Sequence, residues 1–274
     1  MTSHSFGEHL RSWRRRRHLS QQALADRAEL STRHLSFLEN GRSAPSREMV
    51  LRLAERLDVP LRQRNPILES AGYAPLYHGR SLDAPEMSAV RRALDIVLDG
   101  HMPNPCLAFD RCYDVVATNP AVSLLLSGVD AALLVPPVNV VRLSLHPGGL
   151  ARHVVNFTQW RKHIIDRLER QLEQTGDAHV RRLMEEVRTY PRPALEHRHA
   201  EHEHPGVFLP LQLRTTSGVL SFLNTVTVFG TPHDVTLQEL AIESFFPADD
   251  FTAEELVRLS SRAERLAPSS GASG

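Results

Sequence analysis

The densest set of side chains that could bind a metal lies between residues 196 and 204, where four histidines and three glutamates fill seven of the nine positions. Imidazole and carboxylate groups at this density can bind zinc, copper or nickel. Pro191 and Pro193 precede this run, and the pair Pro205-Gly206 follows it. This composition favours a solvated loop that would hold a metal loosely, so we predict no metal site and no cofactor.

The two cysteines, Cys106 and Cys112, are too few for a disulfide framework. Their place on an expected hairpin favours buried small side chains over a redox switch. The sequence contains no glycine-rich phosphate loop, nucleophile elbow, zinc-protease His-Glu spacing or dinucleotide fingerprint after an expected strand. We therefore expect that the protein is not an enzyme.

Charge is distributed unevenly along the chain. The 32 basic and 32 acidic residues cancel overall, but residues 1–75 contain 13 arginines against 8 acidic residues, a net charge of +5. The remaining 199 residues carry the compensating net charge of −5. A basic amino-terminal segment on an acidic body indicates a nucleic-acid partner for the first segment alone.

The basic segment has the pattern of an all-helical bundle. Apolar spacing and capping residues predict helices at about residues 6–17, 21–30, 32–40 and 46–57, and a short fifth helix from near Pro66. Ser20 and Ser31 are the expected N-caps of the second and third helices. Two short helices joined by a tight turn form a helix-turn-helix, whose second helix enters the major groove.

Helical geometry selects the residues that reach base edges. The first turn of the third helix and the next turn on the same face hold four of them, namely Thr32, Arg33, Ser36 and Phe37. Arg33 could pair with guanine, and Phe37 could pack on a thymine methyl group. Leu35 and Leu38 face the core instead.

Residues 19–25 and 31–42 resemble the phage-repressor-like helix-turn-helix known as the XRE family. The resemblance implies phosphate contacts by Gln21, Asn40 and Arg42, and a structural ion pair between Arg14 and Glu39. Arg15, Arg16 and Arg17 suit either phosphate contact or a solvated face. The alternative for the whole segment is a helical bundle that contacts only proteins.

The body is expected to be a second domain at residues 89–266, after a linker at 76–88 and before a disordered tail at 267–274. Periodicity predicts helices at about 90–98, 119–126, 154–174 and 180–187, and hairpins at 106–117 and 207–229. Capping-box spacings at Thr236 and Thr252 predict two more helices. This order favours an α+β PAS-like domain with an antiparallel sheet and a small cavity.

Four segments of the body, at residues 106–119, 145–150, 155–161 and 227–232, look like the MmyB-like ligand-binding domain. That family stands behind an XRE-type head in bacterial transcription regulators. The resemblance covers roughly residues 95–250 and implies a PAS-like pocket for a fatty-acid-like or other largely apolar ligand.

The candidate pocket residues are of two kinds. The aromatic ones lie on expected core-facing elements and could equally be ordinary core; they are Phe109, Trp160, Phe222 and Phe229. His146, Asn156 and Arg161 could orient a polar head group, with helix capping and loop bracing as their alternative roles.

The sequence as a whole predicts a bacterial transcription regulator with double-stranded DNA as its partner and a homodimeric state, since one recognition helix reads few base pairs. Arg14 to Arg17 stand where a signal peptide would need an apolar core, and no apolar stretch is long enough to span a membrane, so we expect a cytoplasmic protein. The main alternative is a DNA-binding scaffold whose body only dimerises or binds a protein. A weaker alternative is an enzyme tethered to DNA.

Overall fold

The computed structural model describes residues 5–193, 209–228 and 235–266. Within these ranges the chain divides into two compact units. The first unit contains residues 5–81 together with 170–177 and 235–238, and the second contains 82–169, 178–193, 209–228 and 239–266. Each unit is described separately.

The first unit is an all-helical bundle, as the sequence predicts. Its helices up to residue 70 are α1 (Phe6–Arg16), α2 (Gln21–Ala28), α3 (Thr32–Glu39), α4 (Arg47–Arg56) and α5 (Leu61–Ser70). A serine precedes each of the first four, and its hydroxyl oxygen accepts a hydrogen bond from the backbone N–H three residues later. Side-chain caps of this kind fix where a helix begins.

The fifth helix begins earlier than the sequence prediction, which placed its start near Pro66. It starts at Leu61, directly after Pro60, and holds Pro66 in its interior. Because Pro66 has no N–H, it cannot donate a backbone hydrogen bond to the preceding turn of the helix. Burial of Leu61, Ile67 and Leu68 stabilises the helix across this gap.

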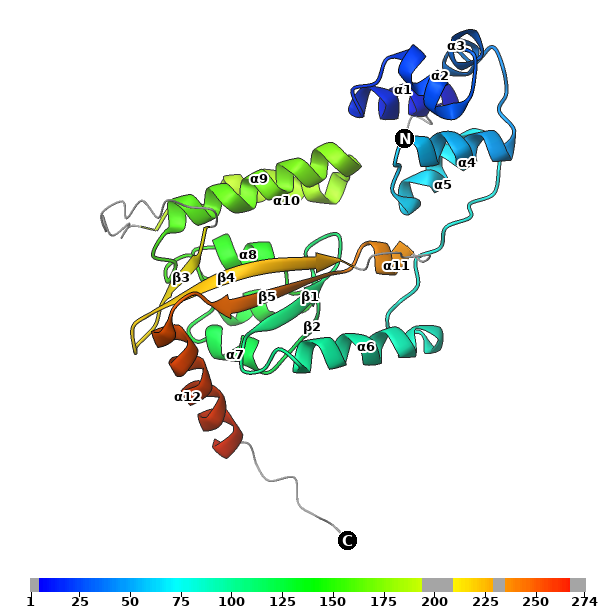
Figure 1. Cartoon of the computed structure of the whole chain (residues 1–274). Coiled ribbons are helices and arrows are strands. Elements are labelled where there is room, and N and C mark those ends of the chain that lie inside the picture. Colours follow the sequence, from blue (N-terminus) through cyan, green and yellow to red (C-terminus); the bar gives the residue numbers. More distant parts are fainter. Residues whose placement is uncertain (1–4, 194–208, 229–234, 267–274) are drawn as a thin grey trace. The chain divides into compact units, whose positions relative to one another are not determined.

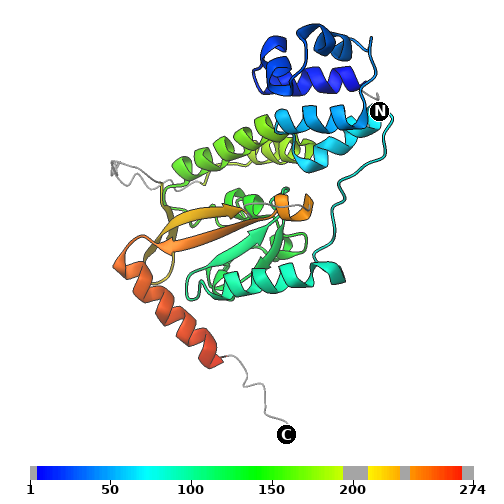
Figure 2. The same cartoon turned by 45° about the vertical axis from the view of Figure 1, so that its right-hand side comes forward.

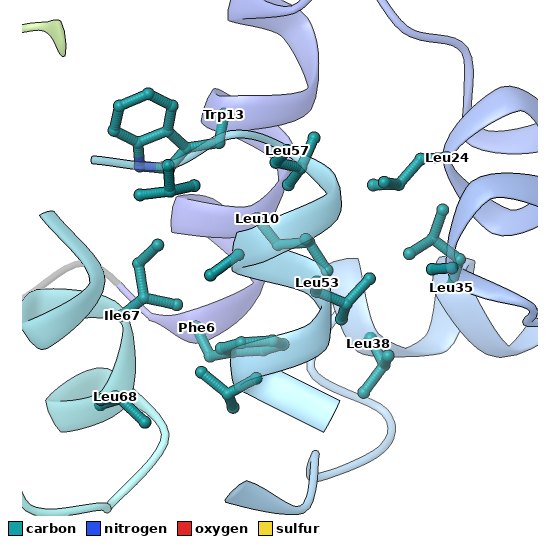
Figure 3. Close-up of a cluster of buried hydrophobic side chains, with 14 of the residues drawn as sticks. Phe6, Leu10, Trp13, Leu24, Leu35, Leu38, Leu53, Leu57, Ile67 and Leu68 are labelled. Atoms are coloured by element: carbon teal, nitrogen blue, oxygen red, sulfur yellow. The ribbon is translucent and has the colours of Figure 1, made fainter. Parts of the chain in front are cut away.

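The core of the first unit is built from all five helices and the loop after α4 (Figure 3). Its large members are at most 7% exposed and project toward one another from the helices. They are Phe6, Leu10, Trp13, Leu24, Leu35, Leu38, Leu53, Leu57, Ile67 and Leu68. Burial of each side chain contributes about 1.5–3 kcal/mol to the free energy of unfolding. The shared core thereby holds α2 and α3 at a fixed angle.

The second unit is an α+β domain, as the sequence predicts (Figure 1). Its helical elements are η1 (Pro85–Met87), α6 (Ser88–Asp99), α7 (Ala121–Leu125), η2 (Ala131–Leu134), α8 (Val140–Leu145), α9 (Phe157–Thr175), α10 (Ala178–Arg188) and α12 (Asp250–Leu266). Of α9, residues 157–169 belong to this unit and the remainder to the first. Its strands are β1 (Cys106–Phe109), β2 (Val115–Thr118), β3 (Leu211–Arg214), β4 (Val219–Val228) and β5 (Ala241–Pro247). The long helix α9 begins at Phe157 rather than 154, because Val154 forms a bridge with Leu213.

The five strands form one antiparallel sheet in the order β2-β1-β5-β4-β3. The central strand β5 contradicts the prediction that the segment after Thr236 is helical. The helix there, α11 (Val235–Gln238), has four residues, and the chain enters β5 at Ala241. Partners on both sides, β1 and β4, satisfy the backbone of β5 and override the local helical signal.

The capping box expected at Thr252 and Glu255 is also absent. The carboxylate of Asp249 caps α12 by accepting the Thr252 N–H at 2.7 Å. The Thr252 hydroxyl is buried and accepts the N–H of Ser221 at 2.9 Å. The Glu255 carboxylate instead accepts hydrogen bonds from Ser217 and Arg258. Val207, expected in the long hairpin, lies outside the described residues.

Helices cover both faces of the sheet (Figures 1 and 2). On one face, Leu94 and Leu98 of α6 pack against Cys106, Ala108 and Ile242. On the other face lie α8 and α9. Successive residues of β5 therefore point alternately to two different environments, which places Glu243 and Phe245 on the side of α9.

Candidate nucleic-acid interface and ligand cavity

The turn between α2 and α3 is stabilised by local hydrogen bonds. Ser20 accepts the N–H of Ala23 at 3.0 Å, and Ser31 accepts the N–H of His34 at 3.1 Å. Glu29 adopts the left-handed conformation, with φ of 57°, and the next N–H bonds back to the carbonyl of Ala25. These features hold the two short helices in the arrangement of a helix-turn-helix.

The four residues predicted to reach base edges lie on α3 away from the core, while Leu35 and Leu38 are fully buried. Arg33 is exposed, and its guanidinium carbon stands 5.4 Å from the centre of the Phe37 ring. The Thr32 hydroxyl donates to the side chain of Gln22 on α2. The carbonyl of Ser36 accepts a hydrogen bond from Asn40.

The residues implied as phosphate contacts differ in their surroundings. Arg42 is exposed. The amide of Gln21 donates to the carboxylate of Glu39 at 2.8 Å, and the Asn40 side-chain oxygen accepts from Arg11 at 2.7 Å. Gln21 and Asn40 are thus held in position by neighbours from α3 and α1.

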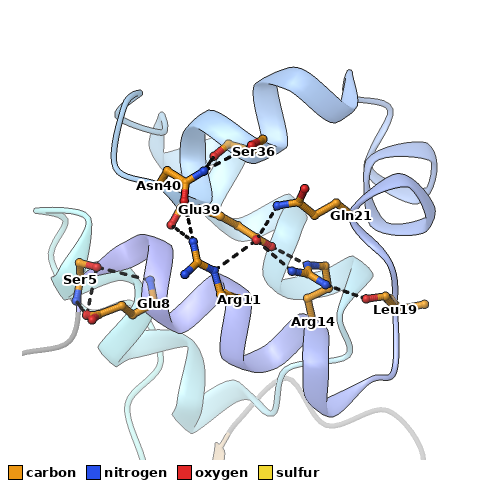
Figure 4. Close-up of polar contacts among 9 residues, drawn as sticks. All are labelled: Ser5, Glu8, Arg11, Arg14, Leu19, Gln21, Ser36, Glu39 and Asn40. Carbon is orange, nitrogen blue, oxygen red and sulfur yellow. Dashed lines mark hydrogen bonds and ion pairs between the residues drawn. The ribbon is translucent and has the colours of Figure 1, made fainter.

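The buried carboxylate of Glu39 on α3 joins this helix to α1 and α2 (Figure 4). The side chain of Glu39 is fully buried and accepts two hydrogen bonds from Arg14, at 2.6 and 2.9 Å, which confirms the expected structural pair. Burial alone would raise the pKa of Glu39, but the hydrogen bonds from Arg14 and Gln21 outweigh it and hold that pKa below its ordinary value. Arg11, which sequence reasoning missed, adds bonds to the Glu39 carbonyl and to Asn40. Its spacing of three residues from Arg14 on the same helix is the signal that could have found it.

The sequence left open whether Arg15, Arg16 and Arg17 contact phosphates or form a solvated face. Of these, Arg17 has a structural role. Its guanidinium donates to the carbonyls of Leu57 and Asp58 at 2.8 and 2.6 Å, at the end of α4. It therefore satisfies carbonyls that a helix end leaves without partners.

The second unit contains a cavity of about 80 Å³ between the sheet and α7, α8 and α9. Most of its lining is apolar. The lining residues are Pro105, Leu107, Tyr113, Val122, Leu125, Leu126, Val140, Val141, Leu143, Ser144, Leu150, Trp160, Ile164, Arg167, Leu211, Leu213, Glu243 and Phe245. A largely apolar cavity with a few fixed polar groups is the usual form of a small-molecule site.

An ion pair forms part of this lining. Arg167 Nη1 donates to Glu243 Oε1 at 3.1 Å, and the amide of Asn224 donates to the same oxygen at 3.0 Å. The guanidinium carbon of Arg167 also stands 5.1 and 5.0 Å from the ring centres of Phe109 and Tyr113. Burial opposes the charge of Arg167, but Glu243 and Tyr113 outweigh it and raise the pKa of Arg167 above its ordinary value.

Two family models match the chain. The model of the MmyB-like transcription regulator ligand binding domain matches residues 90–259, more than half of the chain, and a helix-turn-helix model matches residues 10–63. The chain belongs to the MmyB-like transcription regulators. It is thus a DNA-binding transcription regulator with a ligand-binding domain.

Other comparisons with this MmyB-like regulator are weaker. The comparison with curated proteins finds no significant match. A solved structure titled "Structure of an RNA-binding Light-Oxygen-Voltage Receptor" is similar at 14% identity and a TM-score of 0.24. The match covers 94% of this chain and 65% of that one, so the regulator spans about two thirds of the length of that structure.

The structure places one of the candidate pocket residues, Trp160, in the cavity wall, where its indole N–H donates to Ser144 at 2.7 Å. Phe109 and Phe222 are buried but do not line the cavity: Phe109 lies under Arg167, and Phe222 packs edge-on against Phe245. Phe229 lies outside the described residues.

The three polar candidates of the MmyB-like regulator brace the fold away from the cavity lining. His146 accepts the N–H of Gly148, and its ring meets that of Tyr190 edge-on. Asn156 bonds to the backbone of Pro210 and Gln212, which ties the start of α9 to β3. Arg161 donates to the carbonyl of Arg188 at the end of α10.

Sequence reasoning also missed the charged pair at the cavity of this regulator, Arg167 and Glu243. No local signal could have joined the two residues, which lie 76 positions apart.

Within the described ranges, no group of three or more histidine, cysteine, aspartate or glutamate side chains is placed to hold a metal ion, and the histidine run at 196–204 lies outside them. Cys106 is fully buried, and burial raises the pKa of its thiol, as fits a small core side chain. Among the described helices, none combines the length and the apolar character needed to cross a bilayer.

Proposed function

We propose that this regulator reads a DNA operator through the exposed face of α3 and that a small, largely apolar molecule in the cavity alters its DNA affinity. The observation that carries the proposal is the cavity of the ligand-binding domain, which is lined mainly by apolar side chains and has one ion pair in its lining. Its volume of about 80 Å³ is below the roughly 300–1,000 Å³ of drug-sized pockets. A short acyl chain is therefore the kind of ligand that we propose.

In this proposal, base readout falls to Thr32, Arg33, Ser36 and Phe37. The Arg33 guanidinium is already held over the Phe37 ring, so the pair can reach the groove with little loss of side-chain freedom. Gln21, Asn40 and Arg42 would contact phosphates, Gln21 and Asn40 being fixed by Glu39 and Arg11. Such fixed contacts set the register of a protein on the duplex.

We further propose a homodimer that binds two half-sites about one helical turn apart, because one helix contacts too few base pairs for specific binding. The ligand would act by favouring or opposing the spacing of the two heads that fits the operator. Coupling of this kind typically changes affinity by a factor of roughly 5–150.

The DNA part is tested on duplexes selected from a random pool by the full chain. Arg33→Ala should weaken binding to the selected duplex by about 1–3 kcal/mol and leave binding to a scrambled duplex unchanged. Arg42→Ala should weaken both duplexes equally and reduce the salt slope by about one. The control is Arg92→Ala, at an exposed site on α6. If both head variants bind as the wild type does, the assignment of α3 is wrong.

The sensing part is tested by native mass spectrometry of the purified chain, followed by DNA titration with and without any co-purified molecule. A bound apolar molecule that changes the DNA affinity supports the sensor. An unchanged DNA affinity and melting temperature across a panel of apolar molecules would favour a scaffold whose body only dimerises or binds a protein.

A further inference from the structure

The cavity contains both members of a buried ion pair, and this limits the kind of polar group that a ligand can carry. The side chains of Arg167 and Glu243 are 17% and 6% exposed and lie 3.1 Å apart at their closest atoms. Both line the cavity. The charge of each is therefore already balanced inside the protein.

Other neighbours reinforce this balance. Phe109 and Tyr113 present their rings to the guanidinium, and Asn224 donates to the carboxylate. Two further polar side chains belong to the lining, and both have partners: the hydroxyl of Tyr113 is hydrogen-bonded to Arg167, and Ser144 accepts the indole N–H of Trp160. None of these neighbours adds a net positive charge to the cavity.

We infer that the cavity selects an apolar molecule whose polar end is uncharged, such as an alcohol, an amide or an ester, over one that ends in a carboxylate. The inference rests on the proposed ligand-binding function and names the class of ligand. A carboxylate would bring a net negative charge into a site whose own charges cancel, and it would lose its hydration without gaining a counter-charge. An uncharged group can exchange hydrogen bonds with the pair and keep the site neutral.

The test compares three short probes of equal chain length, butan-1-ol, butanamide and butanoate, whose size suits a cavity of about 80 Å³. Their affinities are measured by calorimetric titration of the full chain at pH 8. The apolar tails are alike, so differences in affinity report the polar end. We expect the two uncharged probes to bind at least about tenfold more tightly than butanoate.

A charge-neutralising variant inverts the expected order. Glu243→Gln keeps the shape and an acceptor oxygen for Arg167 but leaves the guanidinium without its counter-charge, so butanoate should gain about tenfold in affinity while the affinity for butan-1-ol changes little. The double variant Arg167→Gln with Glu243→Gln restores a neutral site and should cancel that gain. Glu186→Gln, at a carboxylate outside the cavity lining, is the matched control. Melting temperatures verify that each variant is folded.

The outcomes separate this inference from the proposed function. If butanoate binds the wild type as tightly as butan-1-ol does, or if folded Glu243→Gln does not favour butanoate, the selectivity is overturned while ligand binding stands. If none of the three probes binds the wild type, the proposed apolar ligand is itself wrong, and the inference fails with it.

Discussion

Each unit of the molecule contains a buried glutamate paired with an arginine, but the two pairs differ in what surrounds them. Glu39 is fully enclosed and accepts hydrogen bonds from Arg14 and Gln21, side chains of two other helices. Glu243 accepts from Arg167 and Asn224 and lines a cavity.

The difference shows how one kind of contact can serve two purposes. In the head, every partner of the carboxylate comes from the bundle, so the contact fixes α1, α2 and α3 relative to one another. In the body, the side of the pair that lines the cavity meets whatever the cavity holds. The first pair therefore fixes the geometry of the helices, and the second places polar groups in the wall of an otherwise largely apolar cavity.

The largest expected effect comes from removing the enclosed carboxylate. Glu39→Ala should lower the free energy of unfolding by about 3–5 kcal/mol, because it leaves Arg14 buried without its counter-charge. Urea denaturation in a Trp160→Phe background, where Trp13 is the fluorescent reporter, measures this effect. Glu55→Ala, at an exposed site on α4, is the control and should change the value by less than about 0.5 kcal/mol. An equal loss in both variants would refute the role of Glu39.

Removing one member of the ion pair at the cavity should lower the free energy of unfolding by a smaller amount. Arg167→Met should lower the free energy of unfolding by about 2 kcal/mol, since Glu243 keeps the hydrogen bond from Asn224. The measurement is urea denaturation in a Trp13→Phe background, which follows Trp160 in the cavity wall. Arg92→Met is the control. A loss as large as that of Glu39→Ala would remove the contrast between the two pairs.

Acidic pH should lower the stability of the first unit through protonation of Glu39. Its pKa is lowered in the folded state, so the stability that the ionised carboxylate contributes is fully present above the unfolded pKa of about 4.5 and is lost as pH falls through the folded value. Each unit of lowering is worth about 1.4 kcal/mol. Denaturation of wild type and Glu39→Gln between pH 6 and pH 3 should show a smaller fall in the variant. Parallel curves would mean that Glu39 is not the titrating group.

The smallest effect concerns the turn that sets the angle between α2 and α3. Glu29→Gly should raise the free energy of unfolding by about 1 kcal/mol, because glycine adopts a φ of 57° without the strain that a side chain brings. Glu29→Ala removes the charge and keeps the strain, so it serves as the control. If alanine stabilises as much as glycine does, the cause is charge rather than backbone conformation.

The head could be predicted almost entirely from the sequence because its signals are local. Serine caps lie directly before α2, α3 and α4, and the apolar spacing within each helix marks the buried face. The start of α5 was predicted too late because Pro66 was taken as the first helical residue. Pro66 instead lies inside the helix at an exposed position, and the buried side chains of the same helix stabilise it.

The body could be predicted as a class of fold but not in its centre. The strand β5 was missed because its pairing partners, β1 and β4, lie elsewhere in the chain and leave no local trace. The cavity residues show the same difference between local and long-range signals. Trp160 was predicted from the periodicity of its own helix, whereas the contact between Arg167 and Glu243 forms only when β5 is in place. Long-range strand pairing therefore determines both β5 and the ion pair.

The central position of β5 also orders events during synthesis. The β1–β2 and β3–β4 hairpins share no pairing with each other until residues 241–247 join them. A nascent chain emerging from the ribosome thus completes its α1–α5 bundle long before the sheet can close. For that interval we expect a chain whose helix-turn-helix is already folded while the walls of its ligand cavity are still incomplete.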